Sequence, residues 1–573
     1  MRFAQKLIIS LVAIYAISMT FSLVTKAPRA RKLYSDFFEL PLSAKSEHKF
    51  INKTLAHKVL KALDSFTPVP EVYYQTPSGS VKKFNKNYLG LTNNNHYCEE
   101  HRAFFVENSA ELFSKMHLIM DIRNFVRQKA IGSSGIDLML EAGQTDKNQT
   151  NVTLNPAANL FFTTISMYTR KNLGQHFSCL TQTSNHIPGN RILSTKDFAA
   201  KAAKNYQENL ANKPECLSSH KLFPKTWDLQ EERECSQFFA QIDSPQYQKE
   251  KQQKGIVYIR KTGSGAHRGA GVEPVNDKEE NLLRTKYANG TKCGLVAENF
   301  IIQQYIHNPL LIEGRKFDFR MYMLLASTNP LLAYYHDGFL RVSIIDYNVS
   351  SNDKRSLLTN LILNKLLYKS IKDGNLYKGM NKEGLRRAQQ WSFEALQEYL
   401  LREKIIHDEN WLDNYLRPEM KKAMIHLIKM AKDNLLKSSS VYELYGVDFM
   451  LDRDLNLWFI EANAGPSFDG YSKPMEKFIV KMLADHFEIV HGLLKSRMKR
   501  IVVFVNKMIL ENLVNENGEI KDLMVRRKEF EKVIMNRFEK EFEPKITNGF
   551  SKIIDENLGG VEVYSGLVSS QCL

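Results

Sequence analysis

Two carboxylates and one amide in the segment Tyr445–Ser467 have the types and spacing of a metal-binding group. The segment, YGVDFMLDRDLNLWFIEANAGPS, carries Asp448, Glu461 and Asn463 in two apolar runs on either side of a turn-like DRDLN. This pattern predicts a β-hairpin, and residues two apart on one strand, such as Glu461 and Asn463, project from the same face. With Asp448 opposite them, the three side chains suit Mg²⁺ bound together with substrate phosphates. Taken alone, the segment is equally well explained as an ordinary hairpin with a surface salt bridge.

A glycine-rich run, Tyr258–Val272 (YIRKTGSGAHRGAGV), has the composition of a phosphate-binding loop. Its glycines would let backbone N–H groups approach phosphate oxygens. Lys261 ends the strand that enters the loop, where its ammonium could hold a phosphate as a point charge. A flexible surface hairpin would account for any single glycine of the run, but not for the set.

Between these two segments, the run KFDFRMYMLLA alternates charged and large apolar side chains. On a strand this places Lys316, Asp318 and Arg320 on one face and the phenylalanines on the other. Arg341 begins a further strand after the turn-like HDG, and its planar guanidinium suits bidentate recognition of a carboxylate or phosphate. The alternative for the charged face is a half-exposed strand with a solvated outer side.

These segments, taken in order, resemble the tubulin tyrosine ligase-like family of amino-acid ligases. The resemblance extends over roughly 185–467, about half of the chain, and includes FPKTWDL (Phe223–Leu229), Phe300–Ser343 and LTN (Leu358–Asn360). It implies an α+β protein with the ATP-grasp fold, in which mixed sheets form two lobes with the nucleotide between them. We expect four regions: a hydrophobic anchor or signal segment over 1–30, an N-terminal region over 31–184, the ligase core over 185–470 and a basic helical C-terminal extension over 471–573.

The resemblance also implies roles for individual residues. The residues that match nucleotide contacts are Lys261, Arg268, Gly269, Gln303, Gln304, Tyr305, Ile306, Lys316, Asp318, Thr359 and Asn360. Those that match Mg²⁺ ligands are Asp448, Glu461 and Asn463. Among the matches to catalytic residues, Arg320 would lie near the transferred phosphate, Arg341 would meet the carboxylate of the incoming amino acid, and Glu461 would hold the metal.

The chain departs from the family pattern at several positions. Thr262 stands where many members have proline, and one extra residue is present around 267–268. Leu358 replaces a histidine, and Ile362 occupies a position where glutamate-adding members tend to have a small polar residue. These departures leave ATP binding intact as an expectation and leave the choice of amino acid open.

The expected activity is therefore ATP- and Mg²⁺-dependent addition of an amino acid to tubulin through an acyl phosphate, with glutamate favoured and glycine or tyrosine as alternatives. A rival from another class is a catalytically inactive, membrane-tethered protein that binds microtubules. The formal net charge of +16 and the pI near 9.2 favour an acidic partner. Glutamate-rich tubulin tails fit, whereas the chain carries no recognised nucleic-acid motif.

Two helical stretches are predicted near the C-terminus. The first, Lys473–Val514, contains the cluster Lys495, Arg497, Lys499 and Arg500. This cluster would serve either as a platform for the acidic microtubule surface or as the solvated face of helices that cover the core. A second charged helix is expected over 528–557, and a further helix over 100–130.

The N-terminal run Leu7–Val24 is uncharged, largely apolar and 18 residues long, which is enough for a membrane helix. Basic residues are more numerous on its C-terminal side, so an anchored chain would face the cytoplasm, associated with microtubules or cilia. A cleaved signal is the alternative. Six cysteines lie scattered without metal-ligand spacing, which predicts free thiols in a reducing compartment.

Overall fold

The computed structural model describes helices and strands in most of the C-terminal two thirds of the chain and in short pieces before it. The described residues are 51–64, 73–75, 81–83, 103–106, 127–128, 158–162, 183–187, 189–210, 222–263, 271–349, 357, 359, 381–437, 441–466, 468, 471–535 and 549–556. The hydrophobic run 7–24 lies outside these residues. Among the described helices, none is both long and apolar enough to span a bilayer.

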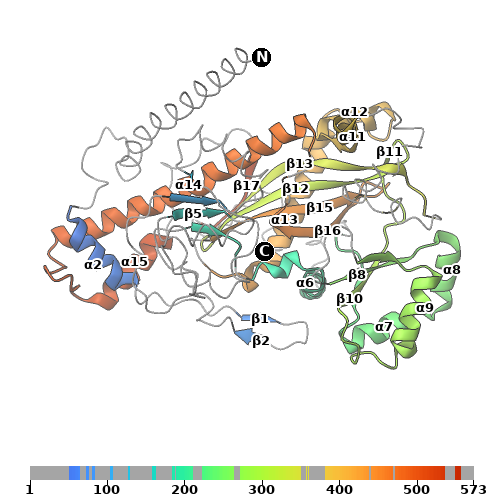
Figure 1. Cartoon of the computed structure of the whole chain (residues 1–573), viewed down its shortest axis with the longest axis horizontal. Coiled ribbons are helices and arrows are strands. Elements are labelled where there is room, and N and C mark those ends of the chain that lie inside the picture. The colour runs from blue at the N-terminus through green and yellow to red at the C-terminus, as the bar shows by residue number, and fades with distance from the viewer. Residues whose placement is uncertain are drawn as a thin grey trace, which may run out of the picture.

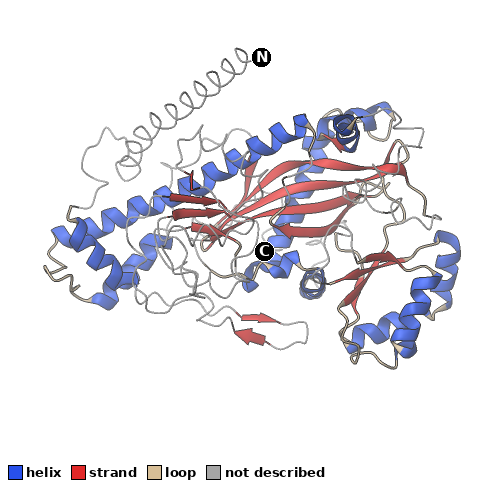
Figure 2. Ribbon diagram, in the orientation of Figure 1, coloured by secondary structure: helices blue, strands red, loops and turns tan. Residues whose placement is uncertain are grey.

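The centre of the molecule is an antiparallel sheet whose main strands follow the order β13-β12-β15-β16 (Figures 1 and 2). Their bounds are β12 Arg315–Thr328, β13 Leu331–Asp346, β15 Val441–Leu451 and β16 Leu457–Ala464. The predicted hairpin is confirmed, since β15 and β16 pair antiparallel around the DRDLN turn. Short strands extend the edge beyond β13 and β12: β11 Leu311–Ile312, β14 Gln390–Trp391 and β17 Phe550–Asp555.

On the other side of β15 the sheet continues with parallel strands. They are β3 Ala103–Val106, β4 Arg127–Gln128, β5 Ala158–Phe162 and β6 Thr183–Asn185, and a separate hairpin joins β1 Tyr73–Gln75 to β2 Val81–Lys83. The helix predicted over 100–130 is therefore wrong at both of its ends, where Phe104 and Phe105 of β3 pair with Arg127 and Gln128 of β4. Both pieces are β-strand segments whose pairing partners lie far along the chain, which a local pattern does not reveal.

The two faces of the sheet are covered by different helices, as the alternation along β12 requires. Phe317, Phe319 and Met321 pack on the face covered by α13 (Arg417–Ala431), whereas Tyr322 and Leu324 belong to the core under α14. The core on this face also includes α12 Phe393–Arg402 and a π-helical turn at Leu412–Leu416, and a 3₁₀ turn at Lys432–Asn434 follows α13. The helix α11 Lys382–Gln389 lies against β13 and β14. The α14 face is apolar only from Tyr322 onward, and its other half carries the charged residues of the candidate site.

The C-terminal extension is helical, as predicted, but it ends in a strand. The long helix α14 (Lys473–Leu510) crosses the sheet, and α15 (Leu523–Met535) and α2 (Lys53–Asp64) pack at its far end (Figure 1). The prediction of a helix over 528–557 is wrong for Phe550–Asp555, because these residues form β17 and pair with β13.

Two arginines of the basic cluster on α14 bind neighbouring elements of the fold. Arg497 is only 2% exposed, and its Nη2 donates to Thr183 Oγ1 at 2.7 Å. Arg500 donates to Val533 O at 2.9 Å and to Ser496 Oγ at 2.7 Å. The platform hypothesis is therefore wrong for these two arginines, which tie α14 to β6 and α15.

A smaller lobe contains the antiparallel sheet β7-β10-β8-β9 and three helices (Figures 1 and 2). Its elements are β7 Thr226–Asp228, α7 Glu232–Ile242, α8 Pro245–Lys254, β8 Tyr258–Thr262, β9 Val272–Pro274, α9 Asp277–Lys286, a 3₁₀ turn at Ala288–Gly290 and β10 Phe300–Gln304. Local sequence sets its helix starts: Ser244 and Asn276 accept the backbone N–H three residues on, from Tyr247 and Glu279. Two short helices, α5 Arg191–Ser194 and α6 Lys196–Asn209, connect this lobe to the large sheet.

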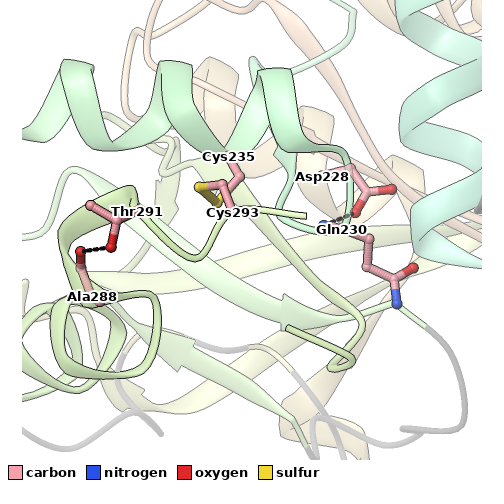
Figure 3. The surroundings of a disulfide bond; sticks show 6 residues. All are labelled: Asp228, Gln230, Cys235, Ala288, Thr291 and Cys293. Atoms are coloured by element: carbon pink, nitrogen blue, oxygen red, sulfur yellow. Dashed lines mark hydrogen bonds between the residues drawn. A yellow bond between two sulfur atoms is a disulfide. The ribbon is translucent and has the colours of Figure 1, made fainter. Parts of the chain in front are cut away.

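A disulfide joins Cys235 of α7 to Cys293, with the two Cα atoms 5.6 Å apart (Figure 3). Both cysteines are buried in the core of the small lobe with Trp227 and Phe239. The prediction that all six cysteines are free thiols is therefore wrong for this pair, because sequence spacing could not show that the two side chains meet. The other four cysteines lie outside the described residues.

Candidate nucleotide and metal site

The hairpin places the three predicted metal ligands on one face. Asp448 lies directly opposite Glu461 in the β15–β16 register, and Asn463 lies opposite Gly446. Asn463 Nδ2 donates to Glu461 Oε1 at 3.3 Å. Glycine is required at position 446, because a Cβ there would lie 2.8 Å from Pro466 and 3.2 Å from the side chain of Arg320. The absence of a side chain at Gly446 thus leaves room for Arg320 and Pro466 beside the predicted metal ligands.

Two arginines from neighbouring strands meet the Asp448 carboxylate. Arg320 donates from Nε to Oδ1 at 2.5 Å and from Nη2 to Oδ2 at 3.0 Å, and Arg341 Nη2 donates to Oδ2 at 2.7 Å. Arg341 also binds Asp318 through two bonds of 2.6 and 2.7 Å. Burial alone would lower the pKa of Arg341, but the Asp318 and Asp448 carboxylates raise it well above its ordinary value. Both arginines therefore remain cationic in the absence of any ligand.

The charged face of β12 continues from this network to Lys316. Its Nζ donates to Leu357 O at 3.0 Å and to Tyr305 Oη at 3.2 Å. Burial lowers the pKa of Lys316 to about 7, against the opposing effect of Asp318. The hydroxyl of Thr359 donates to Asp318. The predicted alternation on β12 is confirmed, and it brings Lys316, Asp318 and Arg320 into one polar surface with Arg341.

A second lysine approaches the metal ligands from the small lobe. Lys261 Nζ donates to Gln303 Oε1 at 2.5 Å, and burial lowers its pKa to about 8. Lys196, which sequence analysis did not single out, lies with its Nζ 3.2 Å from Glu461 Oε2. Burial would raise the pKa of Glu461, but the ammonium groups of Lys196 and Lys261 outweigh burial and hold this pKa at about 2.

Lys196 is fixed by the turn that precedes the glycine-rich loop. Its backbone N–H donates to Gly263 O at 3.1 Å, and a Cβ at position 263 would lie 2.1 Å from Asn299 Oδ1. Asn299 in turn donates to Asp197 Oδ2 at 2.8 Å. Lys196 belongs to the region that resembles the family, which begins near residue 185, but none of the motifs that carry the resemblance includes it.

The four residues 303–306, which match nucleotide contacts in the family, lie at the end of β10 and directly after it. The backbone N–H groups of Gln304 and Tyr305 donate to Lys225 O and Val257 O at 2.8 and 2.9 Å, so sheet pairing uses both. The side chain of Gln303 lies on the Lys261 side of the site, where its Nε2 donates to Thr226 Oγ1 at 3.0 Å. Two of the four residues have apolar surroundings. Tyr305 packs with Ile256, Ile259 and Leu357. Ile306 lies beside Met450, Trp458 and Ile460, in surroundings that suit a ring. Arg268, Gly269 and Asn360 lie outside the described residues.

The donor set fits Mg²⁺ held jointly with phosphate. Within the described part of the chain, no three His, Cys, Asp or Glu side chains form a metal-binding group. The two carboxylates and the Asn463 oxygen supply a partial set of hard ligands, as Mg²⁺ requires when waters and phosphate oxygens complete its octahedron. Positive charge from Arg320, Arg341 and Lys196 already neutralises these carboxylates, so a divalent cation would replace existing ion pairs.

The geometry agrees with comparisons to known proteins. Residues 174–500 match the sequence model of the tubulin-tyrosine ligase family. The chain is similar to protein polyglycylase TTLL10 of Rattus norvegicus, with 25% identity over 53% of the chain and 44% of the relative. It is 31% identical to tubulin glycylase 3C of Tetrahymena thermophila, over 41% of the chain and 21% of the relative. It is 27% identical to probable tubulin polyglutamylase TTLL9 of Mus musculus, over 55% of the chain and 70% of the relative.

The chain thus spans less than half of the length of the first two of these relatives. The human protein matched under the TTLL10 name is called an inactive polyglycylase. The relatives differ both in the amino acid that their names give and in whether they are named as active.

Proposed function

The chain belongs to the tubulin-tyrosine ligase family, and we propose that it is an ATP-dependent ligase that joins an amino acid to a glutamate-rich protein, in the first instance tubulin. The observation that carries this proposal is the single polar face of β12, β13, β15 and β16. It presents Asp448, Glu461 and Asn463 beside a row of cations. Such a face can hold a nucleoside triphosphate and neutralise the charge that moves during phosphoryl transfer.

The proposed reaction is formation of an amide from a carboxylate and an amine. An acceptor carboxylate oxygen attacks the γ-phosphorus of ATP, the bond to the β-phosphate oxygen breaks and ADP leaves. The amine of the free amino acid then attacks the acyl carbon, the carbon–oxygen bond to phosphate breaks, and the amine loses a proton. The chain's part is positioning and charge neutralisation.

The site residues divide this work. Asp448, Glu461 and Asn463 would hold Mg²⁺, which supplies charge neutralisation at the phosphates when bound. Lys261 and Arg320 would hold the phosphate oxygens. Ionised Glu461 retains its charge throughout the neutral range, because its pKa is held at about 2.

The adenine and the amino acid are assigned to opposite ends of the face. The backbone of Ile306 would meet the adenine edge, with the ring packed near Met450 and Trp458. Arg341 would receive the carboxylate of the amino acid, by exchanging one of the two carboxylates that it binds in the free protein.

Glutamate, glycine and tyrosine are the candidates for addition. Names of relatives support glycine (TTLL10 and 3C) and glutamate (TTLL9). We retain glutamate as the first candidate, with glycine beside it. Tyrosine follows, because the four relatives described above carry other names.

The cellular setting follows from the proposed substrates. ATP and tubulin place the ligase in cytoplasmic structures rich in microtubules, such as cilia, with 7–24 as the proposed membrane anchor. Free thiols were one reason to expect a reducing compartment, and the Cys235–Cys293 disulfide removes that reason. The proposed location therefore rests on the proposed acceptor, tubulin.

An isotope-transfer experiment tests the proposed chemistry. A glutamate-rich acceptor peptide labelled with ¹⁸O in its side-chain carboxylates is incubated with ATP, Mg²⁺ and glycine or glutamate. An acyl-phosphate route transfers one ¹⁸O to inorganic phosphate for each amide formed. Appearance of the label in AMP would replace the proposed intermediate with an adenylate, and ATP binding without any amide would favour the inactive microtubule-binding rival.

A further inference from the structure

The disulfide of the small lobe joins a helix to a surface turn. Cys235 lies near the start of α7 and is 0% exposed, and Cys293 is 7% exposed. Figure 3 shows Cys293 in the irregular chain that follows the 3₁₀ turn at Ala288–Gly290. The residues on either side of Cys293, from Thr291 to Leu295, are exposed. Cys293 is therefore a buried side chain on a segment whose backbone lies at the surface.

The α7 side of the disulfide is tied to α6, the helix that enters the candidate site. Glu234, the residue before Cys235, lies with its Oε1 2.6 Å from Lys204 Nζ. Glu231, at the start of α7, pairs with Lys201 at 2.8 Å. Both lysines belong to α6. The start of α7 thus holds the middle of α6 through two ion pairs.

The Cys293 side leads to the other end of the same helix. Further along this segment, Asn299 donates from Nδ2 to Asp197 Oδ2 at 2.8 Å, and its carbonyl accepts from the backbone N–H of Gly263 at 2.9 Å. The carbonyl of Gly263 in turn accepts from the backbone N–H of Lys196 at 3.1 Å. The segment after Cys293 therefore holds both the start of α6 and the residue at which β8 passes into the glycine-rich run.

The disulfide thus joins the two elements that attach α6 to the small lobe. Lys196 Nζ lies 3.2 Å from Glu461 Oε2, and its position depends on both attachments. Lys261 depends on the same segment, because it pairs with Ile301 of β10, the strand that follows residues 293–299. With the bond intact, α7 and this segment are held together. With the bond broken, each can move without the other.

Reduction of the bond would displace the surface turn and leave α7 in place. Two thiols need more room than one disulfide, since unbonded sulfur atoms stay at van der Waals separation, and protein cores are close-packed. The turn cannot move closer to α7: a Cβ at Gly290 would lie 3.2 Å from Phe239 Cβ, and one at Gly294 would lie 3.1 Å from Glu232 Cβ. Its other side faces solvent, so the turn moves outward.

We propose that the Cys235–Cys293 pair is a redox switch on the nucleotide site. The disulfide form holds Lys196, Lys261 and the Gly263 turn in the arrangement that receives the phosphates, and the dithiol form binds nucleotide more weakly. The inference rests on the proposed function and adds its regulation. In the cytoplasmic setting proposed above, protein disulfides characteristically act as redox sensors.

The switching reaction is thiol–disulfide exchange with a dithiol reductant. A thiolate of the reductant attacks Sγ of Cys293 on the surface turn, the bond between the two cysteine sulfurs breaks, and the Cys235 sulfur leaves as a thiolate and takes up a proton. The second thiol of the reductant attacks the reductant's own sulfur in the mixed disulfide, which releases Cys293 as a thiol. The cysteine pair gains a pair of electrons, and the reductant is oxidised to its disulfide.

Nucleotide binding by the full chain in its two redox forms tests this inference. The oxidised chain is compared with the chain reduced by dithiothreitol, and alkylation with mass spectrometry identifies the free thiols. Titration calorimetry gives the affinity for Mg²⁺ with a non-hydrolysable ATP analogue. The test variant carries Cys235→Ala and Cys293→Ala. The matched control carries serine at the four remaining cysteines, Cys98, Cys179, Cys216 and Cys572.

We expect reduction to weaken the affinity for the analogue about fivefold to twentyfold, reversibly on reoxidation. The double alanine variant should bind as weakly as the reduced wild type and should not respond to dithiothreitol, whereas the four-serine control should respond as the wild type does. Equal affinity in the two redox forms would overturn the inference. So would a response that persists in the double alanine variant, or a disulfide that resists dithiothreitol in the folded chain.

Backbone hydrogen exchange separates the switch from the proposed function. The amides of Lys196 and Gly263 donate to Gly263 O and Asn299 O, and reduction should speed their exchange about tenfold or more. Amides of β12, which lies between β13 and β15, should change by less than about twofold. Faster exchange without analogue binding in either form would contradict the proposed function and leave the redox-controlled movement in place. Unchanged exchange at both amides would overturn the switch.

Discussion

Glu443 and Asp448 are two buried carboxylates on the same strand, β15, and they are held by different kinds of partner. Each residue is 1% exposed. Glu443 is bound by backbone and short side chains of the segment between β6 and α5, whereas Asp448 is bound by the long side chains of Arg320 and Arg341. Burial of a charge is common to both, so burial alone does not identify a functional carboxylate.

The partners of Glu443 are fixed in place. Its Oε2 accepts from Ile187 N at 2.9 Å and from Asn190 Nδ2 at 2.8 Å, and its Oε1 lies 3.0 Å from His186 Nδ1. The backbone of His186 has a positive φ of 67°, which this carboxylate helps to hold. The Ile187 N–H belongs to the backbone between β6 and α5, so this bond is lost only if that segment moves.

The partners of Asp448 can move aside, since guanidinium groups on long side chains can rotate away while their strands remain paired. Asp448 also lies opposite Glu461, which lines a cavity. A carboxylate that can exchange a cationic side chain for a metal ion is suited to chemistry. One held by backbone and short side chains is suited to stability.

The largest expected effect on catalysis comes from Glu461→Gln, at the residue opposite Asp448. The substitution removes a metal ligand and should lower the ligation rate by about 10³-fold or more. The apo melting temperature should stay close to that of the wild type, but the stabilisation by Mg²⁺ and nucleotide should be lost. Ligation assays and thermal melts measure the two quantities, and near-normal turnover would remove the metal assignment.

Glu443→Gln should give the reverse pattern. Loss of the charge that binds the β6–α5 segment should lower the free energy of unfolding by about 3 kcal/mol. The turnover per folded molecule should remain near that of the wild type. Chemical denaturation combined with active-site titration measures both, and a loss of turnover with unchanged stability would reverse the roles given to the two carboxylates.

Arg341→Ala tests the role of one of the two arginines that bind Asp448. If Arg341 receives the amino-acid carboxylate, its removal should raise the KM for the amino acid about tenfold or more, since one charge-assisted pair is lost. The KM for ATP should rise less. Steady-state kinetics with each substrate varied in turn separates the two, and equal increases would show that Arg341 serves the nucleotide instead.

The smallest expected effect is a pH dependence of nucleotide affinity. Burial lowers the pKa of Lys316 to about 7 and that of Lys261 to about 8. Bound phosphate favours the charged ammonium, so binding takes up protons where the free lysines are neutral, and affinity falls as the pH rises from 7 to 9. Lys316→Arg should reduce the pH dependence of the affinity near pH 7, and Lys261→Arg should reduce it near pH 8. A pH-independent affinity in the wild type would contradict the lysine contacts.

Sequence patterns predicted the site where it depends on strand alternation, and failed where it depends on distant partners. The period of two placed Lys316, Asp318 and Arg320 on one face and Glu461 beside Asn463, and the structure confirms both. Burial of Arg497 could not be foreseen, because its partner Thr183 is far along the chain. Pairing of Cys235 with Cys293 depends on a similar long-range contact.

The most direct test of the account is incorporation of radiolabelled glutamate, glycine and tyrosine into microtubules by the full chain, with ATP and Mg²⁺. The account predicts label from glutamate or glycine, its loss in Glu461→Gln, and its retention per folded molecule in Glu443→Gln. Absence of label from all three amino acids, despite nucleotide binding by the wild type, would contradict the account.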